Sequence, residues 1–182
     1  MKIRRILRHV FHTRGALKRA FPDRVLLAIE RAISESEAKH AGEISFVVEG
    51  ALDGAPLYSN HSTRERALEV FSSMRVWDTE QNNGVLIYVL LAEREVELVA
   101  DRGISSKVAA EAWQQICDAL QAAFRDSAHE QGVLSAITKI SSLLAAHYPP
   151  VLGRANQLSD SPLAQVRGHT PRPAPGSQRD FP

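Results

Sequence analysis

The chain is poor in the residues and runs that mark several common protein classes. Its 182 residues include one cysteine, Cys117, which excludes a disulfide within the chain, and no cysteines and histidines stand at zinc-binding spacings. No window approaches the run of roughly 18 apolar residues that crosses a membrane. The N-terminus lacks the apolar core of a secretory signal. These absences predict a cytoplasmic protein that folds around an ordinary hydrophobic core.

The motifs of common catalytic sites are also missing. The sequence has no G-x-S-x-G, no H-E-x-x-H and no glycine-rich nucleotide loop. Seven histidines are spread over the chain, and none of them pairs with an evident nucleophile. The sequence therefore predicts a binding site more readily than it predicts a reaction.

Acidic residues are absent from the first 20 positions, which carry seven lysines and arginines. Residues 21–148 have the opposite balance, with 11 basic and 19 acidic side chains, and residues 149–182 carry four arginines and two aspartates. The net charge of +1 thus conceals a basic arm on an acidic body. This pattern argues against nucleic-acid binding by the body and indicates that the arm is a separate contact element.

The arm, residues 1–20, opens with an amphipathic pattern. Apolar side chains recur at three- and four-residue spacing over about Lys2–His12, and arginines occupy much of the remaining surface. An isolated helix of this length is only marginally stable, so we expect it to fold against an anionic membrane, a partner protein or its own acidic domain. The residues expected to make the membrane or partner contact are Ile3, Arg4, Arg5, Leu7, Arg8 and Phe11.

The hydrophobic periodicity of the remaining chain predicts an α/β fold. Helices are expected at about 22–39, 62–74, 105–124 and 131–147, and strands at 43–49, 85–91 and 95–100. The helix that starts after Ser62 fits a capping box with Glu65. Strand 85–91 is apolar on both faces, as expected of a parallel strand covered by helices on both sides. The expected fold is a three-layer α/β/α sandwich around a small mixed sheet, formed by residues 21–148.

Residues 149–182 differ in composition from this domain. They contain seven of the nine prolines and few large apolar side chains. Such a segment cannot bury enough apolar surface to offset the entropy of ordering it. We therefore expect a disordered tail after the domain.

The strands 85–91 and 95–100 read as a β-hairpin about a turn at residues 92–94. If Leu91 or Ala92 faces Glu95, the antiparallel register places Asp101 opposite Val85 or Leu86. Asp101 then lies next to Asn83 and Gly84, although it is distant from them in sequence. The sequence therefore predicts that two polar segments converge at one edge of the sheet.

This edge gathers the oxygen-bearing side chains Asp78, Glu80, Asn82, Asn83 and Asp101. Oxygen-only sets of this kind suit Ca²⁺ or Mg²⁺ rather than zinc. Glu43, Trp77 and Arg102 are expected beside them, Glu43 because a parallel first strand starts at the same edge. The alternative is a solvated turn, in which Asn-Asn-Gly supplies positive φ before a strand and Asp78 braces the loop.

The chain resembles the TPM domain family over about Phe21–Pro149. The resemblance is carried by HAGEISFVVE, by RERALEVFSSMRVWDTEQNNGVLIYVLLAEREVELVADRGI and by the helix around Trp113. Many members have Asn-Gly before the central strand, matched here by Asn83-Gly84, and Gly-x-Gly-Leu after the hairpin. Asp101-Arg102-Gly103-Ile104 stands at the second position, so that Asp101 replaces the usual first glycine.

The resemblance is to the short bacterial branch of the family, which lacks a signal peptide and a C-terminal membrane helix. It implies an α/β/α sandwich, oxygen ligands around Asp78, Asn82, Asn83 and Asp101, and calcium binding as in some members. It also implies a LemA-like membrane protein as partner, because such proteins are often found together in bacteria. Plant members have acid phosphatase activity, but the change to Asp101 alters the charge of the site.

Two functions of different classes follow from these observations. The first is a non-catalytic accessory module that binds Ca²⁺ or Mg²⁺ at the sheet edge and associates peripherally with the inner membrane or a membrane protein. The second is a metal-dependent, acid-phosphatase-like hydrolase that uses the same edge to polarise a phosphoryl oxygen. A purely structural docking surface is a third alternative.

Overall fold

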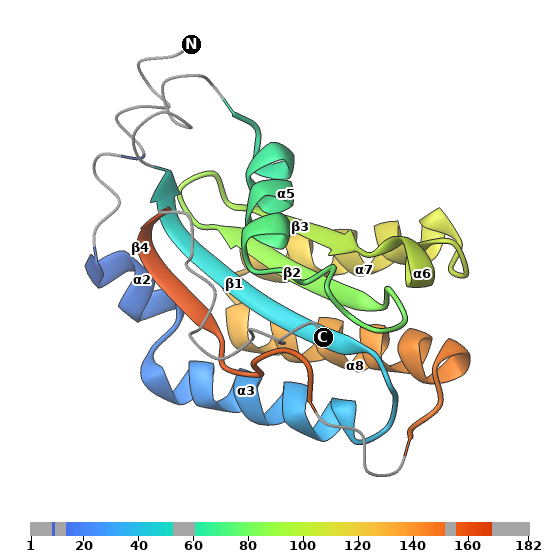
Figure 1. Ribbon diagram of the computed structural model, residues 1–182. Helices are drawn as coiled ribbons and strands as arrows, with labels where there is room; N and C mark the ends of the chain where they lie inside the picture. Colours follow the sequence, from blue (N-terminus) through green and yellow to red (C-terminus); the bar gives the residue numbers. More distant parts are fainter. Residues whose placement is uncertain (1–8, 10–13, 53–60, 152–155, 169–182) are drawn as a thin grey trace, which may run out of the picture.

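The computed structural model describes residues 9, 14–52, 61–151 and 156–168, and these form a mixed sheet covered by helices on both faces (Figure 1). Four strands lie in the order β3-β2-β1-β4. The strands are β1 (Glu43–Leu52), β2 (Gly84–Leu90), β3 (Glu95–Ala100) and β4 (Leu163–Gly168). The helices are α2 (Arg14–Ala20), α3 (Asp23–Glu37), α5 (Thr63–Ser73), α6 (Arg102–Ser105), α7 (Ala110–Arg125) and α8 (His129–His147). The α/β fold class predicted from the sequence is confirmed.

The two faces of the sheet bury separate cores because successive side chains of a strand point in opposite directions. On one face, Ile44, Phe46 and Val48 of β1 pack with Val85, Ile87 and Val89 of β2 against α3, α7 and α8. On the other face, Val47, Leu86 and Leu90 pack against α5, which lies alone on that side in Figure 1. The predicted double-sided burial of the central strand is confirmed, since every residue of β2 is buried.

Local signals in the sequence set several helix ends correctly. Ser62 caps α5, its hydroxyl accepting from the Glu65 amide while the Glu65 carboxylate accepts from the Ser62 amide. Pro22 stands immediately before α3, where its missing N–H costs no helical hydrogen bond. The predicted capping box is thus confirmed.

The predicted register of the β2–β3 hairpin is wrong by one or two residues. Leu90 faces Glu95 and Val85 faces Ala100, which makes the turn one residue longer than expected. Leu91 and Ala92 leave the hairpin because their amides donate to Glu49 O and Gly50 O of β1, each at 2.9 Å. Asp101 therefore lies opposite Gly84, and its amide donates to Gly84 O at 2.9 Å.

The helix predicted at 105–124 is divided into two. The short α6 starts directly after Asp101, whose carboxylate accepts from the Arg102 amide and caps it. Residues 106–109 then turn, which buries Val108 in the core, and α7 begins at Ala110. Asp101 caps a helix four residues before position 105, where the sequence predicted the helix to start, which explains the error.

The expectation of a disordered tail is wrong for one segment. Leu163–Gly168 forms β4, which pairs in parallel with β1 and fills its outer edge. The composition of the whole tail does not reveal this strand, because LAQVRG is a short alternating segment within a stretch rich in proline. Residues 152–155 and 169–182 of the tail lie outside the described residues.

The basic arm is described only in part. Leu17 of α2 is buried in the main core, so residues 14–20 pack on the domain. His9 is also buried, accepting from the Leu52 amide at 2.9 Å through Nδ1 and contacting Glu93 Oε1 at 2.7 Å through Nε2. The predicted helix Lys2–His12 otherwise lies outside the described residues, as do the contact residues Ile3, Arg4, Arg5, Leu7, Arg8 and Phe11.

Candidate functional site

Two buried carboxylates flank a glycine at the end of the sheet where β1 and β2 start and β3 stops, beside α6 (Figure 1). Glu43 of β1 pairs with Gly84 of β2, and Asp101 lies on the other side of Gly84. The side chains of Glu43 and Asp101 are 2% and 7% exposed. Because Gly84 has no side chain, nothing projects from the strand between the two acids.

The space over Gly84 is taken by backbone rather than by a side chain. A Cβ at position 84 would collide with the carbonyl oxygen of Val76. Val76 precedes the polar loop 77–83 and is buried in the core on the α5 side. The backbone carbonyl of Val76 therefore places a third oxygen next to Gly84, at the level of Glu43 and Asp101 in the sheet.

The loop between α5 and β2 is held in one conformation by hydrogen bonds. The Thr79 hydroxyl accepts from the Asn83 amide at 3.0 Å, and the Asn83 side chain donates to Ala41 O at 2.8 Å. Asn82 has a φ of 50°, in the left-handed region that asparagine tolerates. Its carbonyl accepts from the Ile104 amide at 3.2 Å, which joins the loop to α6.

Two residues of the triplet Asp101-Arg102-Gly103, the aspartate and the glycine, have structural roles. Asp101 Oδ1 accepts from the Arg102 amide at 2.7 Å, which caps α6. Gly103 allows the helix to approach the loop, because a Cβ there would collide with the carbonyl oxygens of Gln81 and Asn82. The second carboxylate oxygen of Asp101, Oδ2, is buried and has no hydrogen-bond partner within the described part of the chain.

The structure brings together some of the predicted site residues and leaves others at the surface. Glu43, Asn83 and Asp101 are buried at the same edge, and Asn83 Oδ1 also has no hydrogen-bond partner among the described residues. The side chains of Asp78, Glu80, Trp77 and Arg102 are exposed, and that of Asn82 is half-buried.

Carboxylates alone do not form a complete cation site here. Over the described ranges, no three or more His, Cys, Asp or Glu side chains are arranged to hold a metal ion. Any ion at this edge therefore requires carbonyl, amide or water oxygens in addition to the acids.

Two contributors to this edge are not evident from the sequence. The Val76 carbonyl is one, and Gln157 is the other. The Gln157 amide donates to Glu43 Oε1 at 3.2 Å, and its side chain accepts from the Glu80 amide at 3.1 Å. Gln157 lies in the segment before β4, and no local pattern links it to residues more than 70 positions away.

Comparison with known proteins found matches in sequence family and in fold. The family model of the TPM domain matches residues 17–143, more than half of the chain. The chain belongs to the TPM domain family. The NMR structure of the BA42 protein from the psychrophilic bacterium Bizionia argentinensis is similar to this TPM domain, with a TM-score of 0.68 and 26% sequence identity. The similarity covers 78% of this chain and 92% of BA42. No curated protein sequence matches the chain.

A second polar cluster of the TPM domain lies under α5 and was not predicted. Both carboxylate oxygens of Glu49 accept from Arg66, at 3.0 Å from Nε and 2.8 Å from Nη2. The hydroxyl of Tyr88 donates to Glu49 Oε2 at 2.7 Å, and all three side chains are buried. Burial alone would lower the pKa of Arg66, but the hydrogen bonds and charge of Glu49 together with the hydrogen bond to Glu69 outweigh burial and raise it. The cluster thus holds a fully formed ion pair in the core.

A third polar cluster joins α3 to the segment before β4. Glu37 Oε1 accepts from the Ile44 amide at 3.2 Å. Burial, and then repulsion from Glu43, raise the pKa of Glu37 to about 9, and a hydrogen bond with Asp160 adds to the shift. Glu37 is therefore a neutral acid at neutral pH, in contact with the segment that leads into β4.

Proposed function

We propose that this TPM domain is a non-catalytic accessory module that binds Ca²⁺ or Mg²⁺ at the sheet edge around Asp101. The observation that carries the proposal is the pair of buried oxygens, Asp101 Oδ2 and Asn83 Oδ1, that lack hydrogen-bond partners among the described residues. A buried carboxylate oxygen without a partner is costly. A hard cation removes this cost, because Ca²⁺ and Mg²⁺ take carboxylate and carbonyl oxygens as ligands.

The surroundings supply further oxygens for such an ion. The second carboxylate, Glu43, lies on the other side of Gly84, and the Val76 carbonyl lies over that glycine. Asp78 and Glu80 stand on the loop immediately before Asn83, with exposed side chains. In this proposal Asp101 has two roles, since Oδ1 caps α6 and Oδ2 contacts the ion.

Replacing Asp101 with asparagine tests the cation site and leaves the helix cap in place. Asparagine caps helices about as well as aspartate, so the fold should remain stable while the ligand charge is lost. We expect calorimetry to show saturable Ca²⁺ or Mg²⁺ binding by the wild type. We expect Asp101→Asn to weaken it at least about tenfold, equivalent to about 1.4 kcal/mol.

The matched control is Asp118→Asn, which removes an exposed carboxylate from the middle of α7. It should bind the ion as the wild type does. The cation proposal fails if neither ion gives a saturable heat with the wild type, or if both aspartate variants lose affinity equally.

We further propose that the arm attaches the module peripherally to the cytoplasmic face of the inner membrane, through anionic lipid or a LemA-like membrane protein. The support is the charge pattern, with seven basic and no acidic side chains in the first 20 residues. Among the described residues no helix is long and apolar enough to cross a membrane. Basic side chains near an anionic surface contribute about 1 kcal/mol each.

Co-sedimentation with vesicles that contain phosphatidylglycerol tests the membrane contact. Deletion of residues 1–20 is a poor test, because it also removes the buried Leu17 from the core. The full chain with Arg4, Arg5 and Arg8 changed to glutamine should instead lose most of its binding, about 1 kcal/mol for each charge. A control with exposed Arg31, Lys39 and Lys139 changed to glutamine should pellet like the wild type. Equal pelleting of both variants, or no pelleting of the wild type, contradicts the membrane contact.

The rival function is a metal-dependent phosphatase at the same edge. Arg102 favours it, because its exposed guanidinium follows directly after Asp101 and is of the type that contacts phosphoryl oxygens. Hydrolysis of a generic phosphate ester that requires Mg²⁺ and is lost in both Asp78→Ala and Asp101→Ala would favour the enzyme. The accessory-module proposal expects no turnover above that of the Asp101→Ala variant.

A further inference from the structure

A pocket lined by arginines lies at the opposite end of the sheet from Asp101. It has a volume of about 400 Å³ and lies where the β2–β3 turn meets α2 and the start of α8. The residues that carry the argument are Arg19, Arg94, Phe124, Arg125, Ser127 and His129. We call this cavity the arginine pocket.

The charge of the arginine pocket is opposite to that of the domain around it. Three arginines line it and no acidic residue does, although residues 21–148 carry 19 acidic and 11 basic side chains. Of the acids adjacent to these arginines in the sequence, Glu93 contacts His9 at 2.7 Å. In the part of the chain that the structure describes, Arg19, Arg94 and Arg125 have no ion-pair partner. No carboxylate of the described residues therefore forms an ion pair with these three charges.

Two residues of the arginine pocket adopt a backbone conformation that glycine would adopt at lower cost. Arg94 has a φ of 56° and Ser127 a φ of 60°. Non-glycine residues in this region are strained, and such residues concentrate at ligand-binding sites. The chain keeps side chains with hydrogen-bond donors at both positions, and both line the same pocket.

The start of α8 adds further donors. This helix has 19 residues, and Ala128 provides no side-chain cap, so the first amides of the helix remain available to an anion. His129 packs edge-on against Phe124 at 4.8 Å between ring centroids, and burial lowers its pKa. Its ring, neutral at neutral pH, can donate a hydrogen bond without adding a fourth positive charge to those of the three arginines.

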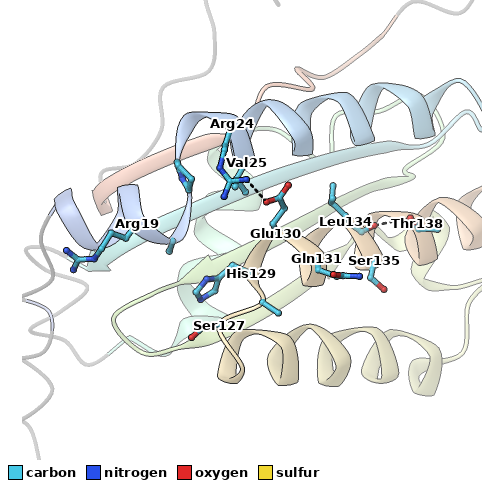
Figure 2. A pocket seen from close by; sticks show the side chains of 13 residues that line it. Arg19, Arg24, Val25, Ser127, His129, Glu130, Gln131, Leu134, Ser135 and Thr138 are labelled. Carbon is cyan, nitrogen blue, oxygen red and sulfur yellow. Dashed lines mark hydrogen bonds and ion pairs between the residues drawn. The ribbon is translucent and has the colours of Figure 1, made fainter.

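The arginine pocket continues into a wider hollow of about 680 Å³ (Figure 2). The two share Arg19, Ala20, Ser127 and His129. Figure 2 shows Arg24 reaching across this hollow to Glu130, at 3.3 Å between Nη1 and Oε2. The hollow provides room for the remainder of a molecule whose anionic group lies against the three arginines.

We propose that the arginine pocket binds the phosphate group of a small soluble phosphate ester. Guanidinium groups form paired, charge-assisted hydrogen bonds with phosphate oxygens. A phosphate group carries up to two charges and enough acceptor oxygens for Arg19, Arg94 and Arg125 together. The site lies at the other end of the sheet from the proposed cation site and does not depend on it.

Calorimetric titration of the full chain with inorganic phosphate and with phenyl phosphate tests this proposal. We expect saturable binding of both, and at least about tenfold weaker binding by Arg125→Gln and by Arg94→Gly. Arg94→Gly separates an effect on phosphate binding from an effect on stability, because glycine relieves the strain at φ 56°. Its melting temperature should rise while its phosphate affinity falls. The control Arg31→Gln removes an exposed arginine that lines neither cavity and should bind within about twofold of the wild type.

Four outcomes overturn the proposal. They are no saturable binding by the wild type, equal loss in Arg31→Gln, chloride binding with the affinity of phosphate, and binding only to phosphatidylglycerol vesicles. The last outcome would assign the arginines to a lipid surface. None of these results depends on Asp101, so failure here is distinguishable from failure of the cation site.

Discussion

Replacing Arg66 with methionine is expected to destabilise the fold by about 3–5 kcal/mol in chemical denaturation. The guanidinium forms two hydrogen bonds with Glu49 at 3.0 and 2.8 Å and is 2% exposed. Without it, the carboxylate of Glu49 stays buried with only the Tyr88 hydroxyl as its donor from this cluster. The loss should be large because an uncompensated buried charge is among the most costly defects in a core.

Two comparisons separate this explanation from a general loss of packing. Arg64→Met changes an exposed arginine of the same helix, bonded to Glu97 and to Leu98 O, and should cost at most about 1 kcal/mol. The combined change of Arg66 to methionine, Glu49 to leucine and Tyr88 to phenylalanine removes the buried charge together with its partners. This triple variant should be more stable than Arg66→Met alone. If it is less stable, or if the two arginine variants cost the same, the buried pair does not have the role assigned to it.

The stability of the wild type should fall as pH rises from about 4.5 to about 9, and Glu37→Gln should remove part of this dependence. In the folded state the pKa of Glu37 is raised to about 9, chiefly by burial and by Glu43. In this pH window the unfolded chain has lost the proton and the folded chain retains it. Raising the pH therefore favours unfolding, by at most about 1.4 kcal/mol per pH unit. The partial accessibility of the carboxyl group should keep the slope below this limit.

Glutamine keeps an oxygen that can accept from the Ile44 amide and carries no charge. At pH 9 the variant should be more stable than the wild type by a few kcal/mol at most, and near pH 4.5 the two should agree. The control Glu35→Gln changes an exposed acid on the same helix and should keep the pH slope of the wild type. Parallel stability curves for wild type and Glu37→Gln would contradict the raised pKa.

The parts of the fold that depend on local patterns could be predicted from the sequence. The alternation of Ile44, Phe46 and Val48 predicted the face of β1 that packs against α3, α7 and α8, and the Ser62–Glu65 capping box predicted the start of α5. Each of these patterns lies within a few consecutive residues and can be recognised without knowing distant contacts. The convergence of Asp101 with Gly84 also followed from the hairpin, although its register was wrong.

The parts that depend on distant contacts could not be predicted in the same way. The hairpin turn is longer than expected because Leu91 and Ala92 bond to β1, and β4 exists because the edge of β1 accepts it. Gln157 reaches the Glu43 edge through that same segment. None of these pairings produces a periodic pattern of apolar residues in the sequence.

The sequence contains a pattern from which the buried Arg66–Glu49 ion pair could have been predicted. Arg66 stands between Thr63 and Val70 at the three- and four-residue spacing of the inward face of α5, whereas Leu68 is 44% exposed. An arginine on the inward stripe of a helix that crosses a parallel sheet requires a buried acid on that sheet. Glu49, at the end of the predicted first strand, was the acid nearest to that position.

The most direct test of the cation site is a crystal structure of the wild type soaked in Ca²⁺. The proposal predicts an ion within about 2.3–2.6 Å of Asp101 Oδ2, with the remaining oxygens drawn from Asn83, the Glu43 edge, backbone carbonyls and water. A structure in saturating Ca²⁺ with no ion within that distance of Asp101 Oδ2 would contradict it.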